Sequence, residues 1–189
     1  MTETVREYGG VLLPPAGKWE LDKAHTTISF VARHMLTKVR GRFGDFDGHI
    51  EVGENPEDTR AEVEVRVASV DSGEQMRDDH LRSADFFDVE RFPVMSFRST
   101  AFRPTGGTTF ELEGDLTIKD ITRPITFQGE FIGWGPGMRG TTMLSGSAKA
   151  TGVEREAWDL TWNVAVETGG FLVSKKVDIE LEFEALHRG

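Results

Sequence analysis

The sequence contains no cysteine among its 189 residues. Disulfide bonds, thiolate nucleophiles and cysteine ligands for metals are therefore all excluded. Long apolar runs are missing too, and no window approaches the about 18 apolar residues that a membrane-spanning helix needs. The N-terminal stretch carries acidic residues early and only the short apolar run Val11-Leu12-Leu13. It lacks the features of an export signal, so we expect a cytoplasmic location.

Basic side chains are in the minority, with 22 Lys and Arg against 32 Asp and Glu and a formal net charge of -10. Phosphates and anionic lipid surfaces repel such a chain, so we expect no nucleic-acid partner and no stable membrane insertion. The G-x-S-x-G and P-loop patterns are absent. None of the five histidines is spaced H-x-H or H-x-x-x-H from another, so no local metal site is predicted.

What the sequence does contain is alternation of apolar and polar residues. A period of two runs through residues 61–67, 110–118 and 177–185. Each stretch predicts a β-strand with one apolar face and one solvated face, and the solvated faces account for much of the acidity. Less regular alternation predicts further strands over residues 28–34, 46–52, 95–99, 125–131 and 142–150, with a short last one over 160–162.

Helical patterns are scarce. Leu81, Ala84 and Phe87 are spaced three apart, which predicts a short helix within residues 76–87 that packs across one end of the sheet structure. Residues 152–160 suit a second short turn. Eight or more strands joined by short turns predict a sandwich or a barrel. We therefore place one all-β domain over residues 17–189, preceded by a poorly ordered N-terminal tail or arm over residues 1–16.

A glycine-rich stretch, Gly135-Pro136-Gly137-Met138-Arg139-Gly140, fits the G-x-G-x-x-G pattern of dinucleotide-binding turns. That turn needs a helix after it, because the pyrophosphate sits on the helix N-terminus. Here the following residues, TTMLSGSAKA, have no helical face. The stretch is instead predicted to be a hairpin connection between two strands.

The polar residues leave alternatives open. His34 continues an apolar strand face, so it is either a hydrogen-bonded core histidine or a polar group at the mouth of a ligand cavity. Residues 77–81, RDDHL, are the densest ionisable cluster and suit a helix start with acids in its first turn. An enzyme acting on a hydrophobic substrate would require His34, His80 and either Asp78 or Asp79 to converge as acid and base groups.

Five segments together resemble a known family: WELDKAHTTISFVARH, GRFGDFDGHI, VASVDSGEQMRDDHLRSADFFDVERFPVMSF, LEGDLTIKDITRPITF and VDIELEFEA. In order and spacing they are similar to the YceI-like family, from about Trp19 to Ala185. The resemblance implies an all-β, lipocalin-like, extended antiparallel barrel of eight strands with one or two short helices. It also implies binding of polyisoprenoid lipids, including prenyl quinones, inside the barrel, often by a homodimer. It carries over no catalytic residues.

We therefore expect a non-enzymatic protein that holds a polyisoprenoid lipid or prenyl quinone for transport, storage or sequestration, with no covalent cofactor. Burying each CH₂ is worth about 0.8 kcal/mol, so a five-carbon prenyl unit contributes up to about 4 kcal/mol before ordering costs. The alternatives are the enzyme described above and a ligand-free, stress-related scaffold with a packed interior.

The expected binding residues follow from the apolar strand faces and from the short helix. A polar head group is expected to meet His34, Arg77 or His80, because the helix should lie near a barrel opening. The expected apolar wall comprises Ile28, Phe30, Ala32, Phe46, Ile50, Val63, Val65, Met95, Phe97, Leu112, Leu116, Phe127, Phe131, Leu144 and Leu181.

Overall fold

A computed structural model describes residues 6–167 and 172–187, most of which lie in β-strands. It has one α-helix, α1 (Gln75–Arg82), and four short 3-10 turns, η1 (Pro56–Asp58), η2 (Val67–Ser69), η3 (Met138–Gly140) and η4 (Arg155–Trp158). The strands are β1 (Glu7–Tyr8), β2 (Val11–Leu12), β3 (Gly17–Leu21), β4 (Thr27–His34), β5 (Thr37–Phe43), β6 (Phe46–Val52), β7 (Arg60–Arg66), β8 (Val70–Asp71), β9 (Val94–Gly106), β10 (Thr109–Ile118), β11 (Ile121–Pro136), β12 (Thr142–Glu154) and β13 (Lys176–His187).

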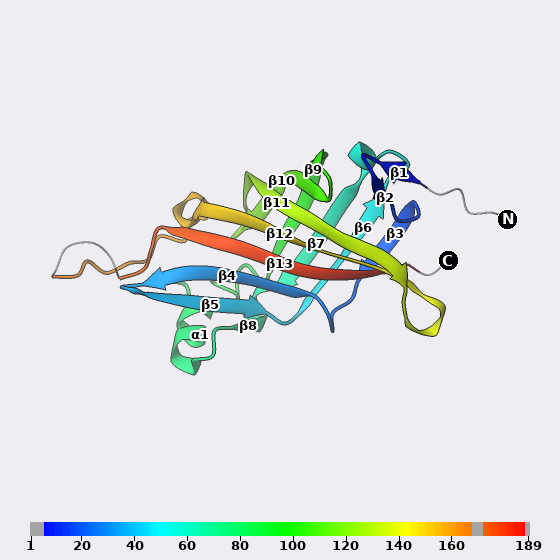
Figure 1. Ribbon diagram of the computed structural model, residues 1–189. Helices are drawn as coiled ribbons and strands as arrows, with labels where there is room; N and C mark the ends of the chain where they lie inside the picture. The colour runs from blue at the N-terminus through cyan, green and yellow to red at the C-terminus, as the bar shows by residue number, and fades with distance from the viewer. Residues whose placement is uncertain (1–5, 168–171, 188–189) are drawn as a thin grey trace.

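Eight of these strands close into a barrel. Around the ring the order is β3, β6, β7, β9, β10, β11, β12 and β13, and β13 returns to β3. Every neighbouring pair is antiparallel. The predicted eight-stranded antiparallel barrel is thus confirmed (Figure 1). Closure removes the free sheet edges of these strands, and the alternating pattern of each strand gives the barrel an apolar inside.

The barrel flares at one end because β13 has two partners along the same edge. Near its C-terminus, Ala185 pairs with Leu21 of β3. Further back, residues 178–182 pair with β4, which continues the chain after β3. β4 then pairs with β5, and β5 with β8 through residues 42 and 43. Helix α1 packs beside β8 under this flare (Figure 1).

Eight of the nine predicted strands are present, and the structure adds five that the alternation did not reveal, β1, β2, β3, β5 and β8. β3 is short, and β5 reads TKVRGRF, in which basic residues and a glycine dilute the apolar signal. The strand predicted over residues 160–162 is wrong. The carbonyl oxygens of Leu160 and Trp162 accept hydrogen bonds from the Arg155 guanidinium instead of from a neighbouring strand.

The two predicted helical segments are present with different limits, and α1 begins one residue before the predicted range of 76–87 and ends five residues earlier. α1 begins after Glu74, whose carboxylate accepts hydrogen bonds from the amides of Met76 and Arg77. It ends at Arg82, because Ser83 adopts an extended conformation. The second segment is the 3-10 turn η4, inside the predicted range of 152–160. The glycine-rich stretch 135–140 connects β11 to β12, as predicted for a hairpin.

The N-terminal segment differs from the predicted tail, because β1 and β2 form a hairpin from residue 7 onward. Its turn is Gly9-Gly10, and both residues have positive φ, which suits a two-residue hairpin. The Arg6 guanidinium fastens the hairpin by donating to the carbonyl oxygens of Pro14, Gly53 and Glu54 at 2.6, 2.5 and 2.6 Å. The hairpin lies at the end of the barrel opposite α1 (Figure 1).

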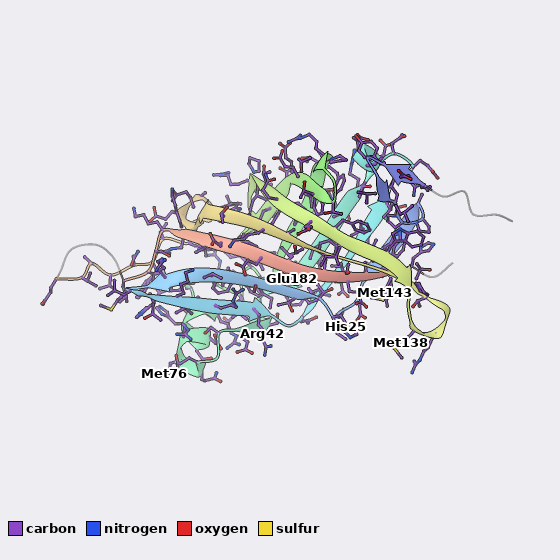
Figure 2. The ribbon with its side chains drawn as sticks, in the orientation of Figure 1. His25, Arg42, Met76, Met138, Met143 and Glu182 are labelled. Carbon is purple, nitrogen blue, oxygen red and sulfur yellow. The ribbon has the colours of Figure 1, made fainter. Side chains whose placement is uncertain are left out.

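The outer surface carries isolated apolar side chains between charged ones. Met76 on α1 and Met138 in the β11–β12 loop are both exposed at the periphery (Figure 2). No helix within residues 6–167 and 172–187 combines the length and the apolar character that crossing a membrane requires.

Replacing Arg6 with alanine is expected to release the hairpin. The variant loses all three carbonyl hydrogen bonds that tie residue 6 to the β6–β7 loop and to Pro14. Hydrogen exchange should show faster exchange of the Leu13 amide, which pairs with the Arg6 carbonyl at 2.9 Å, while β10 and β11 keep their protection. Unchanged exchange at Leu13 would mean that Arg6 does not hold the hairpin.

Candidate functional site

The barrel encloses a cavity of about 330 Å³. Its lining runs from Arg6 and Tyr8 at the hairpin end to Phe86 and Phe87, which follow α1 at the other end. The walls between are made by inward-facing apolar residues of the barrel strands. The volume lies at the lower end of the about 300–1,000 Å³ range that is typical of small-molecule sites.

All but one of the predicted wall residues line this cavity. The exception is Phe46, which is 2% exposed and packs within the buried core beside the cavity. Its inward direction was inferred correctly from the period of two, but neighbouring side chains cover it. The residues that do line the cavity are Ile28, Phe30, Ala32, Ile50, Val63, Val65, Met95, Phe97, Leu112, Leu116, Phe127, Phe131, Leu144 and Leu181.

The interior is hollow along part of its length. Phe30, Phe97 and Leu112 point inward, yet each is only partly buried. Inward-facing residues of a filled barrel would be in contact on all sides, as in other protein interiors. The partial exposure therefore reflects open space in the lumen, which disagrees with the packed interior expected of a ligand-free scaffold.

Four phenylalanine rings lie flat against glycines of the neighbouring strand. A Cβ atom added to any of these glycines would come within 2.2–2.6 Å of a ring carbon. Three of the rings lie directly opposite their glycine across the strand pair, and Phe97 lies diagonally, since it pairs with Leu116 two residues beyond Gly114. Direct and diagonal neighbours share one face of a sheet, so each ring covers the inner wall where the glycine has no side chain. The pairs are Gly41 with Phe30, Gly114 with Phe97, Gly129 with Phe110 and Gly146 with Phe183, and all four rings line the cavity.

The polar residues predicted to meet a head group lie elsewhere. His34 is exposed at the end of β4, where it forms a backbone bridge with Val173. Arg77 donates to the hydroxyl and the carbonyl oxygen of Ser72 at 2.7 and 2.9 Å. His80 pairs with Asp85 at 2.8 Å. None of the three lines the cavity, since α1 turns Leu81 toward it instead.

These side chains do not assemble an acid and base site either. Asp78 is buried and accepts hydrogen bonds from the Ser72 amide and hydroxyl at 2.9 and 2.5 Å. Asp79 accepts from Gln75 at 2.9 Å and from Arg82 at 3.2 Å. Each carboxylate is thus engaged in a local pair that stabilises α1 and the turn before it.

The sequence reasoning missed Arg155, the charged residue that is most deeply buried in the described part of the chain, at 5% exposed. It lines the cavity beside Phe86, with the guanidinium carbon 5.9 Å from the centre of that ring. Its three nitrogens donate to the carbonyl oxygens of Ser174, Leu160 and Trp162 at 2.8, 2.5 and 3.1 Å. Burial lowers the pKa of the Arg155 guanidinium, although arginine stays charged at neutral pH. The sequence indicated only that Arg155 lies in the short turn predicted over residues 152–160.

The sequence reasoning also missed the hairpin, because a short segment before the first strand has no periodicity to detect. Tyr8, Val11 and Leu13 contribute to the cavity lining. The Trp134 indole N–H donates to the Leu12 carbonyl oxygen at 3.2 Å, so the hairpin is also tied to β11. The hairpin therefore covers one end of the lumen.

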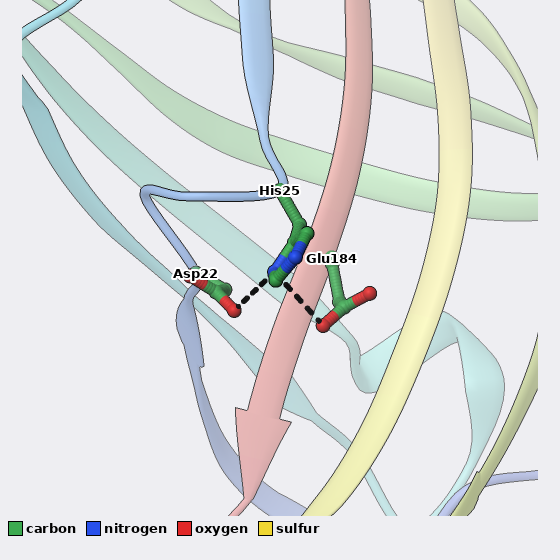
Figure 3. Close-up of side chains that lie close together, drawn as sticks. All are labelled: Asp22, His25 and Glu184. Carbon is green, nitrogen blue, oxygen red and sulfur yellow. Dashed lines mark hydrogen bonds and ion pairs between the residues drawn. The ribbon is translucent and has the colours of Figure 1, made fainter. Parts of the chain in front are cut away.

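One group of residues has the spacing of metal ligands. Asp22, His25 and Glu184 bring one ligand atom each within 4.8 Å of the others (Figure 3). His25 Nδ1 lies 2.8 Å from Asp22 and 3.6 Å from Glu184, so the three already satisfy one another as an ion-pair cluster. The Asp22 amide also donates to the Glu184 carbonyl oxygen at 2.8 Å. The cluster therefore fastens the corner between β3 and β4 to β13.

The chain belongs to the YceI-like family, whose domain matches residues 19–185. It is 33% identical over 165 residues to a UPF0312 protein of Staphylococcus aureus (strain N315), covering 86% of this chain and 94% of that protein. A UPF0312 protein of Ectopseudomonas mendocina (strain ymp) is 36% identical over 141 residues, covering 68% of this chain and 74% of the relative.

Solved structures share the fold. BcnA of Burkholderia cenocepacia superposes with a TM-score of 0.70 at 24% identity, covering 87% of this chain and 98% of that one. A polyisoprenoid binding domain from Saccharophagus degradans, implicated in plant cell wall breakdown, superposes with a TM-score of 0.65 at 14% identity, covering 90% and 98%. At these identities the likeness concerns the fold.

Replacing Gly41 with alanine is expected to drive the Phe30 ring off the wall and into the lumen. The added Cβ would meet ring carbon Cζ at 2.3 Å, and overpacking of this kind costs about 1–3 kcal/mol. Urea unfolding should measure that loss, and the double variant G41A/F30L should recover most of it. Gly44→Ala is the control, because nothing lies within 4 Å of its added Cβ. Equal stabilities of the Gly41 and Gly44 variants would contradict the wall arrangement.

Replacing His25 with asparagine is expected to change how stability depends on pH. The hydrogen bond that His25 Nδ1–H donates to the Asp22 carboxylate raises the pKa of His25 above 6.5, and the same bond lowers the pKa of Asp22 below 3.8. The stabilisation from protonated His25 is complete below pH 6.5 and disappears as the pH rises through its raised pKa. That from ionised Asp22 is present above pH 3.8 and disappears as the pH falls through its lowered pKa.

Thermal unfolding of the wild type and of His25→Asn at about pH 5.5 and about pH 8.5 tests this expectation. The two values lie on either side of about 6.5, the ordinary histidine pKa. The wild type should exceed His25→Asn most at the lower pH, and the two should converge at the higher pH. Glu184→Gln should reduce the difference in part, since Glu184 also raises the pKa of His25. A constant offset between wild type and variant at both pH values would contradict the assignment.

Proposed function

We propose that this protein binds a polyisoprenoid lipid or a prenyl quinone in the barrel lumen, without catalysing a reaction. The observation that carries the proposal is the hollow interior, lined almost throughout by apolar side chains. A prenyl chain needs such a surface and few directed polar contacts. At about 0.8 kcal/mol for each buried CH₂, even a few prenyl units give useful affinity after ordering costs.

Two comparisons support the ligand class. The chain belongs to the YceI-like family, and one structural neighbour is described as a polyisoprenoid binding domain. Binding is favoured over catalysis because the predicted acid and base residues are engaged in local pairs outside the cavity. The hairpin over one end fits a protein that carries or stores its ligand away from water. A homodimer and a cytoplasmic location stay predictions.

Mass spectrometry of the organic extract from natively purified protein tests the proposal, beside a native mass spectrum of the intact complex. A stoichiometric prenyl lipid or quinone is the expected result. An empty extract, together with no uptake when prenyl lipids are offered, would remove the proposed function.

A pair of adjacent substitutions then locates the ligand. Ala32 lines the cavity and Arg33, the next residue of β4, is exposed on the other face. Ala32→Phe places a ring in the lumen and is expected to lower ligand occupancy several-fold, because that space is no longer free. Arg33→Phe adds the same ring outside and should leave occupancy unchanged. Equal occupancy in both variants would place the ligand outside the lumen.

A further inference from the structure

The charged residues of the cavity are all of one sign. Although the chain has a formal net charge of -10, none of the described residues that line the cavity is an aspartate or glutamate. The charged side chains in the lining are Arg6 at the hairpin end and Arg155 beside Phe86. The described lining of this acidic protein therefore includes an arginine at each end and no carboxylate.

The two arginines differ in how their charges are balanced. Arg6 lies 4.0 Å from the Glu54 carboxylate. Within residues 6–167 and 172–187, no carboxylate lies within ion-pair distance of Arg155. Its neighbour Glu156 pairs with Lys175 at 3.5 Å. Neutral carbonyl groups are thus the hydrogen-bond partners of the Arg155 guanidinium, and a buried cation without a counter-charge is costly.

Arg155 also has more hydrogen-bond donors than its contacts with carbonyl oxygens use. A guanidinium has five N–H groups, and the three carbonyl oxygens of Ser174, Leu160 and Trp162 take one each. Within the described residues, one N–H on each terminal nitrogen has no hydrogen-bond partner, and Arg155 is among the residues that line the apolar lumen. Two such donors in one plane match the two oxygens of a carboxylate or the oxygens of a phosphate.

From this geometry we propose that Arg155 binds the polar end of the ligand and that this end is an anionic oxygen group, a carboxylate or a phosphate. The prenyl chain then runs from Arg155 along the phenylalanine-lined wall toward the hairpin. This inference rests on the proposed function, and it selects an anionic head group among the lipids that the lumen can hold. It also moves the head-group site from Arg77 to a residue on η4, at the same end of the barrel.

Three probes with the same prenyl chain test the proposal: farnesol, farnesoic acid and farnesyl phosphate. Each competes for the wild-type protein against one fluorescent prenyl probe, at concentrations below micelle formation. The two anionic ligands are expected to bind about ten- to hundredfold more tightly than farnesol, the range that a charged hydrogen bond supplies. Hydration stabilises the two anions in water more than it stabilises farnesol, and the prenyl chain is the same in all three ligands. Tighter binding of the anions therefore cannot result from burial of the prenyl chain.

Variants separate a head-group site from a structural role. Arg155→Met should bring the three ligands to similar affinities, and Arg155→Lys should keep part of the preference because it keeps the charge. Arg6→Met is the control for the other cavity cation: because it also releases the hairpin, it is expected to weaken all three ligands alike and to preserve the preference among them. If Arg155→Met does not fold, Arg155→Lys and the comparison of the three ligands on the wild-type protein still test whether Arg155 binds an anionic head group.

Each remaining outcome has one meaning. Equal wild-type affinity for the three ligands would overturn the anionic head group while leaving the proposed function standing. Loss of the preference in Arg6→Met would overturn the assignment to Arg155. A parallel loss for all three ligands in Arg155→Lys and Arg155→Met would mean that Arg155 only holds the η4 region together. Failure of every ligand to bind the wild type would remove the proposed function itself.

Discussion

The hollow interior depends on phenylalanine rings that lie flat on glycines. In a small barrel, inward-facing side chains normally fill the space, and an eight-stranded barrel is just wide enough for that. Here Phe30, Phe97, Phe110 and Phe183 each cover a position on the next strand that has no Cβ. The rings bury a large area against the wall and still leave the lumen free. These four contacts therefore contribute both to the apolar character of the lumen and to its open space.

The fold was largely predictable from the sequence, because most strands alternate with a period of two and the period sets which residues face inward. For that reason nearly all of the predicted wall residues line the cavity, and Phe46 fails only because neighbours cover it. Strands without a clear pattern, such as β5, could not be found this way. The isolated pair Leu160 and Trp162 suggested a strand, although a buried guanidinium binds both carbonyl groups.

The polar parts of the site were not predictable for a physical reason. Alternation of apolar and polar residues shows which side chains of a strand face the lumen. Arg155 and the hairpin lie in segments without such alternation. The sequence pointed to the end of the barrel where Arg155 lies, but it assigned the head group to α1, where Arg77 pairs with Ser72 and His80 with Asp85. Arg155 is identified only in the folded structure, which shows that its three hydrogen-bond acceptors are neutral carbonyl groups.

The flare at β13 leaves one strand with an exposed rim. Within the described residues, β5 pairs on its outer side only at positions 42 and 43, so Thr37 to Gly41 offer unsatisfied backbone groups to any passing strand. Lys38 and Arg40 stand at alternate positions on this rim, and Arg40 forms an ion pair with Glu180. A second copy docking antiparallel on this rim would bring like charges together, which disfavours sheet extension. The basic residues that hid β5 in the sequence therefore also disfavour pairing of this edge with the same edge of a second copy.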